Sequence, residues 1–466
     1  MQNKIQSIFC CMNEEKIRYC QWKSSLNLTN SFAGKTDFDI LVDRKDINKL
    51  LSLLINKGFK RRQSTYDKTY HSMEDYIGFD SATGRLIHFH LHYTLIMGKK
   101  LTKNIRIPIE KFVLDNTMID NNFGIKIIQP EIELFLLSFR IMLKTKIGKS
   151  LILTMLKHKR YLPQNIINEY NYLFAKIDFD EFEKIGNLYF MEFYKDVKLL
   201  VNNLNIKLNI FKFFKIKKRI ERKLLKYKRF DSLEKKCEYQ IRKFSSKNSR
   251  NFLSSGGLSI AFIGADGSGK STITEEITHW LNWKLSVRRI YMGIPKKDKM
   301  CIILGYLGNI ARKLQLLKFE KYIFNFRWLY VSYYRKKNFY QSQKFKNQGY
   351  IIVFDRYPLD FFSKMEKPMD GERIDSTSIL SCKEKKNYQQ IKLPDEMICL
   401  RVTLQQSINR KKEHQLSLIQ GTIKNKIEAI DSLVNANISK KIKVINSDCD
   451  LNSKILKIKK IIWDML

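Results

Sequence analysis

The chain contains 466 residues, of which 44% are hydrophobic, and this length predicts two to four domains with substantial cores. Its eight cysteines form no regular framework and no C-x-x-C pair, which excludes a disulfide scaffold and favours reduced thiols. No apolar stretch approaches the roughly 20 residues that span a bilayer, and residues 1–20 are too polar for a secretory signal. We therefore expect a cytoplasmic protein without a transmembrane segment.

The formal net charge of +40 favours polyanionic partners. Lysine, isoleucine and asparagine are abundant along the entire chain, so the charge does not by itself mark a binding face. Because no recognised nucleic-acid module accompanies the charge, we expect no dedicated nucleic-acid partner. A basic chain also suits an enzyme with small polyanionic substrates such as nucleotides. The sequence leaves the oligomeric state open.

Residues 1–128 have an α/β pattern. Strands are expected over residues 38–42, 76–80 and 85–91, and residues 81–84 form a turn-rich hairpin connection between the last two. A helix is expected over residues 46–57, since its leucines and isoleucines share one face and Gly58 follows at its end.

The first of these strands carries two aspartates. Residues 34–42 read GKTDFDILV, and the alternation along a strand puts the carboxylates of Asp37 and Asp39 on one side. Two carboxylates held in this way can coordinate the metal ions of a nucleotidyl transfer. Together with residues 21–25 (QWKSS), this cluster resembles the polymerase-β type of nucleotidyltransferase over residues 15–140. The resemblance implies an α+β domain, although Ser24 and Ser25 stand at the family's phosphate turn without its glycine.

That family takes a third carboxylate from a later strand, and residues 88–92 of this strand read HFHLH without an acid. His88, His90 and His92 alternate onto one face. One interpretation makes them metal ligands, with Asp37, Asp39 and His90 holding a second divalent ion such as Mn²⁺, Fe²⁺ or Zn²⁺. The other makes them polar-face residues of a domain that binds a nucleotide or partner without catalysis.

Residues 129–205 are expected to be helical, with Leu134, Leu137 and Ile141 as one apolar stripe. Residues 206–251 are densely basic and include aromatic residues, as in the segment FKFFK at 211–215. We interpret this stretch as a solvated helical linker between domains. The alternative is an amphipathic helix that makes peripheral contact with an anionic membrane surface.

The last region, residues 252–466, contains the most informative motif. An apolar run at 258–263 predicts a buried strand, residues 264–271 fill the pattern G-x-x-x-x-G-K-[ST], and residues 272–285 continue with helical spacing. A strand, a glycine loop and a helix in this order form a phosphate cradle, so the chain is expected to bind ATP. The residues expected at the nucleotide are Gly264, Ala265, Asp266, Gly267, Ser268, Gly269, Lys270, Ser271 and Thr272.

A second apolar run at 351–354 is followed by the sequence DRYP at 355–358. Ligands of parallel sheets bind at the carboxyl ends of strands, so Asp355 and Arg356 are expected to face the glycine loop. From about residue 259 to the C-terminus, the chain resembles the thymidylate kinase family of P-loop nucleoside monophosphate kinases. The resemblance implies a P-loop fold with a parallel sheet and flanking helices, ATP and Mg²⁺ as cofactors, and a nucleoside monophosphate as the acceptor.

The resemblance also implies roles for single residues. Lys270 reaches the β- and γ-phosphates, and the hydroxyl of Ser271 binds Mg²⁺. Asp355 stands near Mg²⁺ and the acceptor phosphate, and Arg356 grips that phosphate. Phosphoryl transfer requires cations around the transferred group, and Lys270, Mg²⁺ and Arg356 would supply them.

Three further positions follow from the same comparison. Asp266 matches the acid that bonds the acceptor sugar, and Arg335 matches a helix arginine that positions the acceptor. Arg410 lies in the segment of the mobile lid and would supply the charge that some members carry at Gly267. The catalytic set is thus Lys270, Asp355, Arg356 and Arg410.

One departure affects the substrate. Thymidylate kinases carry a Tyr-Gln pair shortly after the Asp-Arg turn, whereas residues 359–364 here read LDFFSK and Tyr388-Gln389 comes much later. Two alternatives therefore stay open beside the nucleoside monophosphate. They are a P-loop kinase for a non-nucleotide metabolite, and a nucleotide-dependent switch or scaffold without catalysis.

Overall fold

The computed structural model divides the chain into two compact units, Met1–Arg250 and Asn251–Leu466. It describes residues 4–99, 101–145, 162–204, 210–246, 250–265, 267–295, 297–358, 378–409, 424, 427–428, 430–432, 442–446 and 450–466. Asp266 and Arg410, two of the expected site residues, lie outside the described residues, as does the segment 359–364. The two units are considered separately.

The N-terminal unit is built on a mixed sheet with the strand order β3-β4-β5-β2-β1-β9-β8. The strands are β1 (Tyr19–Gln21), β2 (Phe38–Val42), β3 (Lys60–Gln63), β4 (Met73–Asp80), β5 (Arg85–His92), β8 (Thr117–Ile119) and β9 (Lys126–Ile128). The expected β4–β5 hairpin is confirmed, and β5 also pairs in parallel with β2. A separate hairpin joins β6 (Ile96–Lys99) to β7 (Thr102–Arg106).

Aromatic side chains hold helices against this sheet. Phe9, Phe38 and Phe89 are almost fully buried, with ring centroids 5.3–5.5 Å apart, so α1 packs directly on β2 and β5. The expected helix 46–57 is confirmed as α3, which contacts α1. The elements here are α1 (Lys4–Glu14), η1 (Ser25–Asn27), α2 (Leu28–Phe32), η2 (Arg44–Asp46), α3 (Ile47–Asn56) and α4 (Glu110–Asp115).

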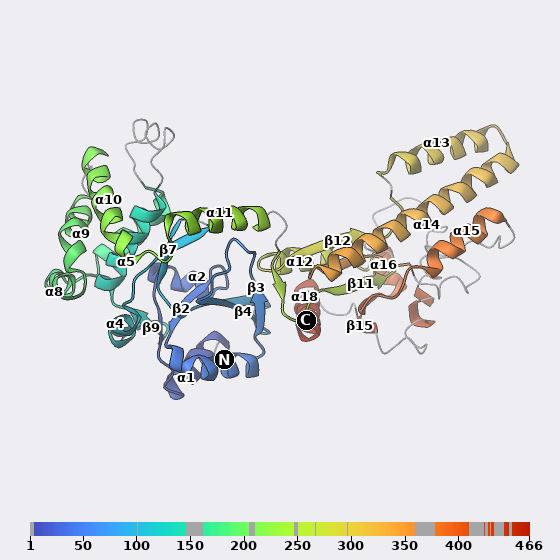
Figure 1. Ribbon diagram of the computed structural model, residues 1–466. Helices are drawn as coiled ribbons and strands as arrows, with labels where there is room; N and C mark the ends of the chain where they lie inside the picture. Colours follow the sequence, from blue (N-terminus) through green and yellow to red (C-terminus); the bar gives the residue numbers. More distant parts are fainter. Residues whose placement is uncertain are drawn as a thin grey trace. The chain divides into compact units, whose positions relative to one another are not determined.

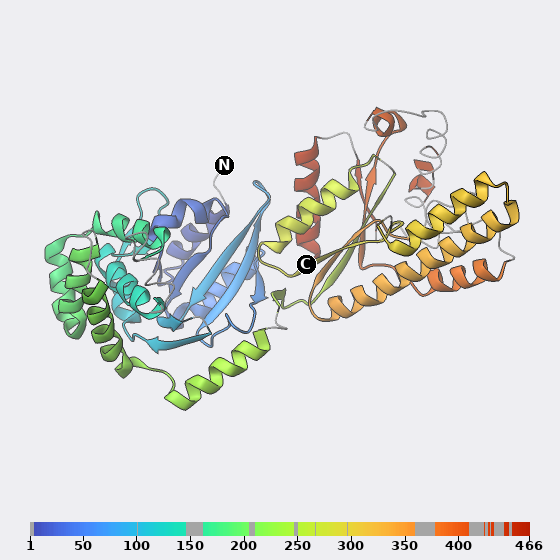
Figure 2. The ribbon, with the colours of Figure 1, turned by 90° about the horizontal axis from the view of Figure 1, so that it is seen from above.

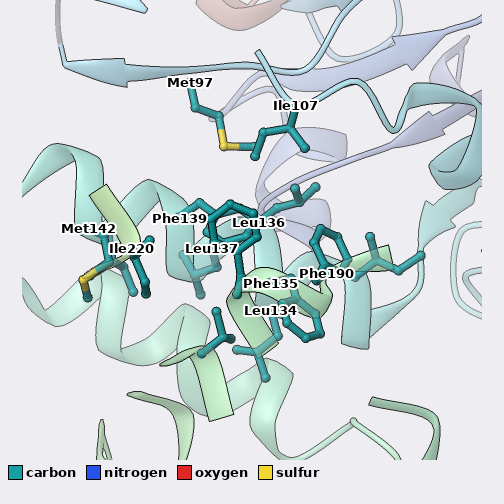
Figure 3. Close-up of a cluster of buried hydrophobic side chains, with 14 of the residues drawn as sticks. Met97, Ile107, Leu134, Phe135, Leu136, Leu137, Phe139, Met142, Phe190 and Ile220 are labelled. Atoms are coloured by element: carbon teal, nitrogen blue, oxygen red, sulfur yellow. The ribbon is translucent and has the colours of Figure 1, made fainter. Parts of the chain in front are cut away.

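Helix α5 is the centre of the second half of this unit. The expected stripe of Leu134, Leu137 and Ile141 is buried, but so are Phe135 and Leu136, because helices surround α5 on several sides (Figure 3). The ring of Phe135 stacks on those of Phe182 and Phe190 at 4.5 and 4.4 Å. The elements are α5 (Pro130–Lys144), α7 (Gln164–Phe174), α8 (Phe179–Tyr189), α9 (Met191–Leu204), α10 (Ile210–Leu224), η3 (Leu225–Tyr227) and α11 (Ser232–Ser246).

The basic segment 206–251 contains α10 and α11. Helix α10 buries an apolar stripe, Phe213, Ile216, Ile220 and Leu224, in the same cluster as α5, and Figure 3 shows Ile220 beside Met142. Full burial of such a side chain stabilises a fold by roughly 1.5–3 kcal/mol. Helix α10 therefore packs as part of the N-terminal unit.

Three basic residues of α10 are paired within the same unit. Lys217 bonds Glu221 of its own helix at 2.6 Å. Arg219 and Lys223 both bond the buried carboxylate of Asp196 on α9, at 2.6 and 2.7 Å.

The C-terminal unit contains a parallel five-stranded sheet in the order β12-β13-β11-β14-β15. Helices α12 and α18 lie side by side on one face, and α14 lies on the other face, where it contacts β13 (Figure 2). The five strands are β11 (Leu258–Gly264), β12 (Val287–Tyr291), β13 (Ile351–Asp355), β14 (Glu396–Arg401) and β15 (Ile442–Asn446). The short strand β10 (Phe252–Leu253) is not one of them. This arrangement is compatible with a P-loop kinase fold.

Helices α13 and α14 pair as a hairpin that extends from the sheet of this unit (Figure 1). The helices are α12 (Lys270–Asn282), α13 (Lys299–Lys313), α14 (Leu317–Asn347), α15 (Ile379–Gln389), α16 (Leu404–Asn409) and α18 (Leu451–Met465). No helix in the described parts of the chain combines the length and the apolar character that crossing a bilayer requires.

Candidate functional site

The glycine loop joins β11 directly to α12. Gly267 and Gly269 have φ angles of +80° and +85°, which glycine adopts without the strain of a Cβ atom. At Gly264, with φ +154°, a Cβ atom would lie 2.6 Å from the carbonyl oxygen of Leu400 on β14. A Cβ atom on Gly269 would meet no atom closer than 3.9 Å, so the loop is open there. The loop thus has the backbone freedom and the space that a phosphate cradle needs.

Lys270, the first residue of α12, lies over this loop. Its buried Nζ donates to the carbonyl oxygens of Gly264 and Ala265 at 2.8 and 2.7 Å, and it lies 3.4 Å from Oγ of Ser268. An ammonium forms stronger hydrogen bonds with anionic phosphate oxygens than with neutral carbonyls. The side chain is therefore already positioned at the loop where a triphosphate would bind.

Asp355 ends the strand next to β11. In the β11–β13 pairing it is in register with Phe262, two positions before Gly264, so the structure brings it to the same end of the sheet as the loop. Its carboxylate is buried, with Oδ2 2.6 Å from Nη2 of Arg289 on β12. Its Oδ1 has no hydrogen-bond partner among the described atoms. A buried carboxylate oxygen of this kind fits a metal ligand.

Arg289 was missed by the sequence analysis. Its guanidinium also donates to the carbonyl oxygen of Ser271 at 3.2 Å, so it joins the start of α12 to Asp355. Residues 287–291 read VRRIY, and a β-branched segment after a helix was the available signal for this strand.

Arg356 has an unusual backbone. Its φ is +71°, in the left-handed region that arginine rarely adopts, and its amide donates to the carbonyl oxygen of Phe262 at 3.2 Å. Its guanidinium carbon lies 5.7 Å from the ring centroid of Tyr291 on β12. Such strained residues concentrate at functional sites because the surrounding structure must hold them.

Arg335 comes from helix α14, which precedes β13 in the chain. It is fully buried on α14, and its Nη1 donates to the phenolic oxygen of Tyr388 on α15 at 2.8 Å. The described residues therefore place Arg335 between two helices, and its contact with an acceptor stays a prediction. Tyr388 belongs to the Tyr-Gln pair that follows the Asp-Arg turn too late to match the kinase pattern.

A second polar cluster lies on the sheet of the N-terminal unit. Asp39 on β2 is in register with His90 on β5. Its Oδ1 lies 3.2 Å from both Nδ1 of His90 and Nε2 of His92, and 2.8 Å from Nζ of Lys23. Burial alone would raise the pKa of Asp39, but Lys23 and the two histidines hold it well below its usual range. Burial lowers the pKa of His90 and of His92.

Asp37 lies in the other half of this cluster. His88 is within 3.0 Å of Asp37 through Nδ1 and within 2.8 Å of Asp75 through Nε2. Burial alone would lower the pKa of His88, but the two carboxylates outweigh it and raise that pKa. The strand 88–92 contains no carboxylate, and the second acid at His88 comes from a neighbouring strand. Asp75 comes from β4, which begins at Met73, three residues before the expected strand.

The Ser24-Ser25 turn is hydrogen-bonded to a buried acid, Glu133. Ser25 donates to Glu133 from its amide at 3.1 Å and from its hydroxyl at 2.6 Å. Burial raises the pKa of Glu133 to about 7, with a further contribution from Glu169, while Ser25 and Arg140 lower it. The hydroxyl of Ser25 thus donates its hydrogen bond to a carboxylate of the protein itself.

Glu133→Gln is expected to flatten the pH dependence of stability. Because the folded-state pKa of Glu133 is raised from 4.5 to about 7, its contribution is fully present below about pH 4.5 and is lost as the pH rises through about 7. The loss corresponds to at most about 3 kcal/mol. Denaturant unfolding at about pH 5 and pH 8 should show a smaller decrease for the variant than for the wild type. Parallel decreases in the two proteins would show that Glu133 is not the responsible group.

Comparison with known proteins gives weak similarities. No family model matches the chain. Two uncharacterized ATP-binding proteins of Escherichia coli strain K12 are similar to part of it. YghR is 26% identical over 186 residues, covering 35% of this chain and 73% of the relative. YghS is 28% identical over 188 residues, covering 35% and 77%.

Among solved structures, deoxyadenosine kinase of M. mycoides is found in two states. With the products dCMP and dCDP it is 19% identical, with a TM-score of 0.31, covering 45% of this chain and all of the kinase. With dATP it is 17% identical, with a TM-score of 0.29, covering 44% and 98%.

Proposed function

We propose that the C-terminal unit is an ATP- and Mg²⁺-dependent phosphotransferase whose acceptor is a nucleoside monophosphate. One observation carries the proposal: a glycine loop opens α12 beside a strand that ends in Asp355, with Arg356 directly after it. The names of the E. coli relatives, which describe ATP-binding proteins, support the donor.

The donor would bind through the loop. Backbone amides at the start of α12 and the positive end of the helix attract phosphate oxygens. Lys270 would exchange its carbonyl partners for the β- and γ-phosphates, and Ser271 and Asp355 would hold the metal. When bound, Mg²⁺ would neutralise charge that develops on the transferred phosphoryl group.

The acceptor would bind at the end of β13. Arg356 would grip its phosphate, while Arg289 orients Asp355 through the 2.6 Å ion pair. The family resemblance adds Asp266 at the acceptor sugar, Arg335 at the acceptor and Arg410 in the lid. Activity of the nucleotidyltransferase-like domain is not part of this proposal.

The non-nucleotide metabolite is the second candidate, because the base-holding Tyr-Gln pair does not follow the Asp-Arg turn. In the later Tyr388-Gln389 pair, the phenolic oxygen of Tyr388 accepts a hydrogen bond from Arg335. A nucleotide-dependent switch or scaffold is the third candidate, since a glycine loop by itself supplies nucleotide binding and not the acceptor site that phosphoryl transfer also needs.

A panel of acceptors is expected to separate these three functions. ADP release from ATP and Mg²⁺ should rise with one or more nucleoside monophosphates, and Lys270→Ala protein serves as the blank. Stimulation by a non-nucleotide metabolite alone would favour the second candidate. If the protein binds ATP but no acceptor stimulates ADP release, the result would favour the nucleotide-dependent switch or scaffold.

A further inference from the structure

The polar cluster of the N-terminal unit contains three potential metal ligands in close contact. They are Asp39 of β2 with His90 and His92 of the adjacent strand β5, and their ligand atoms all lie within 4.8 Å of one another. The Oδ1 atom of Asp39 is 3.2 Å from each of the two imidazole nitrogens. Zinc–nitrogen and zinc–oxygen bonds are about 2.0–2.2 Å long, so neighbouring ligand atoms around one ion lie about 3–3.5 Å apart. The two separations from Asp39 meet this requirement, and the two histidine nitrogens lie within 4.8 Å of each other.

The sheet fixes this geometry. Along β5 the two-residue period puts His90 and His92 on one face, with ring centroids 4.4 Å apart. The parallel pairing sets Asp39 beside His90, and the ring of Trp22 packs edge-on against His92 at 5.1 Å. Because strand register places all three side chains, little ordering would be needed when an ion binds.

The cluster is buried on one side and accessible on the other. The His92 side chain is fully buried, whereas those of His90 and Asp39 are 20% and 15% exposed. The Nδ1 atom of His92 has no hydrogen-bond partner among the described atoms. An ion can therefore enter past His90 while His92 is held in place.

Lys23 is the cation at Asp39 in this structure. Its Nζ lies 2.8 Å from Oδ1, the same oxygen that faces both histidines, and 4.7 Å from the ring of Trp22. Two cations at one carboxylate oxygen repel each other, so an incoming ion has to displace this ammonium.

We propose that Asp39, His90 and His92 bind a single transition-metal ion of the Zn²⁺, Fe²⁺ or Mn²⁺ kind, in competition with Lys23. Imidazole ligands favour these ions, whereas Mg²⁺ prefers an all-oxygen shell. Asp37 is not in this group of three, and its carboxylate lies 3.0 Å from Nδ1 of His88. The site belongs to the N-terminal unit and does not depend on the proposed kinase activity.

Metal titration of the full-length protein tests this site. After chelator treatment, Zn²⁺ is titrated against a chromophoric chelator and Co²⁺ by its visible absorption, both in excess Mg²⁺. One equivalent of each ion should bind. Asp39→Asn and His92→Ala should each weaken binding by about 100-fold or more, since loss of outer-shell partners alone costs 10–100-fold. Lys23→Met, which keeps the apolar stem over Trp22, should tighten binding by about tenfold.

His71→Ala is the matched control, because His71 is an exposed histidine outside the cluster. The binding constants of this variant for Zn²⁺ and Co²⁺ should equal those of the wild type. The opposite directions expected for Asp39→Asn and Lys23→Met distinguish a site from general loss of folding. Absence of saturable Zn²⁺ and Co²⁺ binding by the wild type would overturn the proposal. Binding that survives both Asp39→Asn and His92→Ala unchanged would overturn it as well.

Discussion

Replacing Lys270 with alanine is expected to lower ATP-dependent phosphoryl transfer about a thousandfold. The structure places its ammonium within 2.8 Å of two loop carbonyls, so the substitution removes the one lysine side chain bonded to the loop among the described residues. Charge that develops on the transferred group would then lose a fixed cation. Initial rates of ADP release at saturating acceptor measure the effect.

Lys313→Ala is the control for this experiment, because Lys313 is exposed at the end of α13 and outside the loop. Its turnover should equal that of the wild type. Thermal unfolding of the Lys270 variant separates lost chemistry from lost folding. Full turnover by a folded Lys270→Ala protein would remove the glycine loop from the mechanism.

Asp355→Asn is expected to lower transfer by about 100-fold and to raise the Mg²⁺ concentration that half-saturates the rate. The amide has almost the same size as the carboxylate, so packing at this buried position is kept. It lacks the negative charge that would hold a cation and that pairs with Arg289 at 2.6 Å. Because the side chain of Arg289 is 30% exposed, losing this ion pair costs less than the about 3–5 kcal/mol of a fully buried pair, and a modestly lower melting temperature is expected.

Glu275→Gln provides a matched control for Asp355. Glu275 also faces Arg289, at 3.7 Å, but its side chain is 79% exposed, so the pair contributes little to stability. Its rate and Mg²⁺ dependence should be those of the wild type. A folded Asp355→Asn protein with unchanged Mg²⁺ dependence would contradict a metal-binding role for Asp355.

Local patterns predicted the elements that carry the glycine loop. The apolar runs 258–263 and 351–354 became β11 and β13, since each is a short buried strand with its signal contained in its own residues. Their adjacency in a parallel sheet brings Asp355 to the loop. In the N-terminal unit, β2 was predicted at its full length for the same reason.

Several side-chain contacts between distant segments escaped prediction. Asp75 is opposite His90 only because of the β4–β5 register, and a strand expected from residue 76 left it outside. Arg289 meets Asp355 across 66 positions of sequence, and Arg335 meets Tyr388 across 53. Such pairs depend on tertiary packing, which no local pattern contains.

The ion pairs of α10 reduce the number of basic residues that can neutralise a bound polyanion. Arg219 and Lys223 share Asp196, and Lys217 bonds Glu221. A cation that is already paired within the fold neutralises few phosphates of a polyanion and so displaces few of the counterions condensed on that polyanion. The salt dependence of any polyanion binding should thus be shallower than the count of 86 lysine and arginine residues suggests.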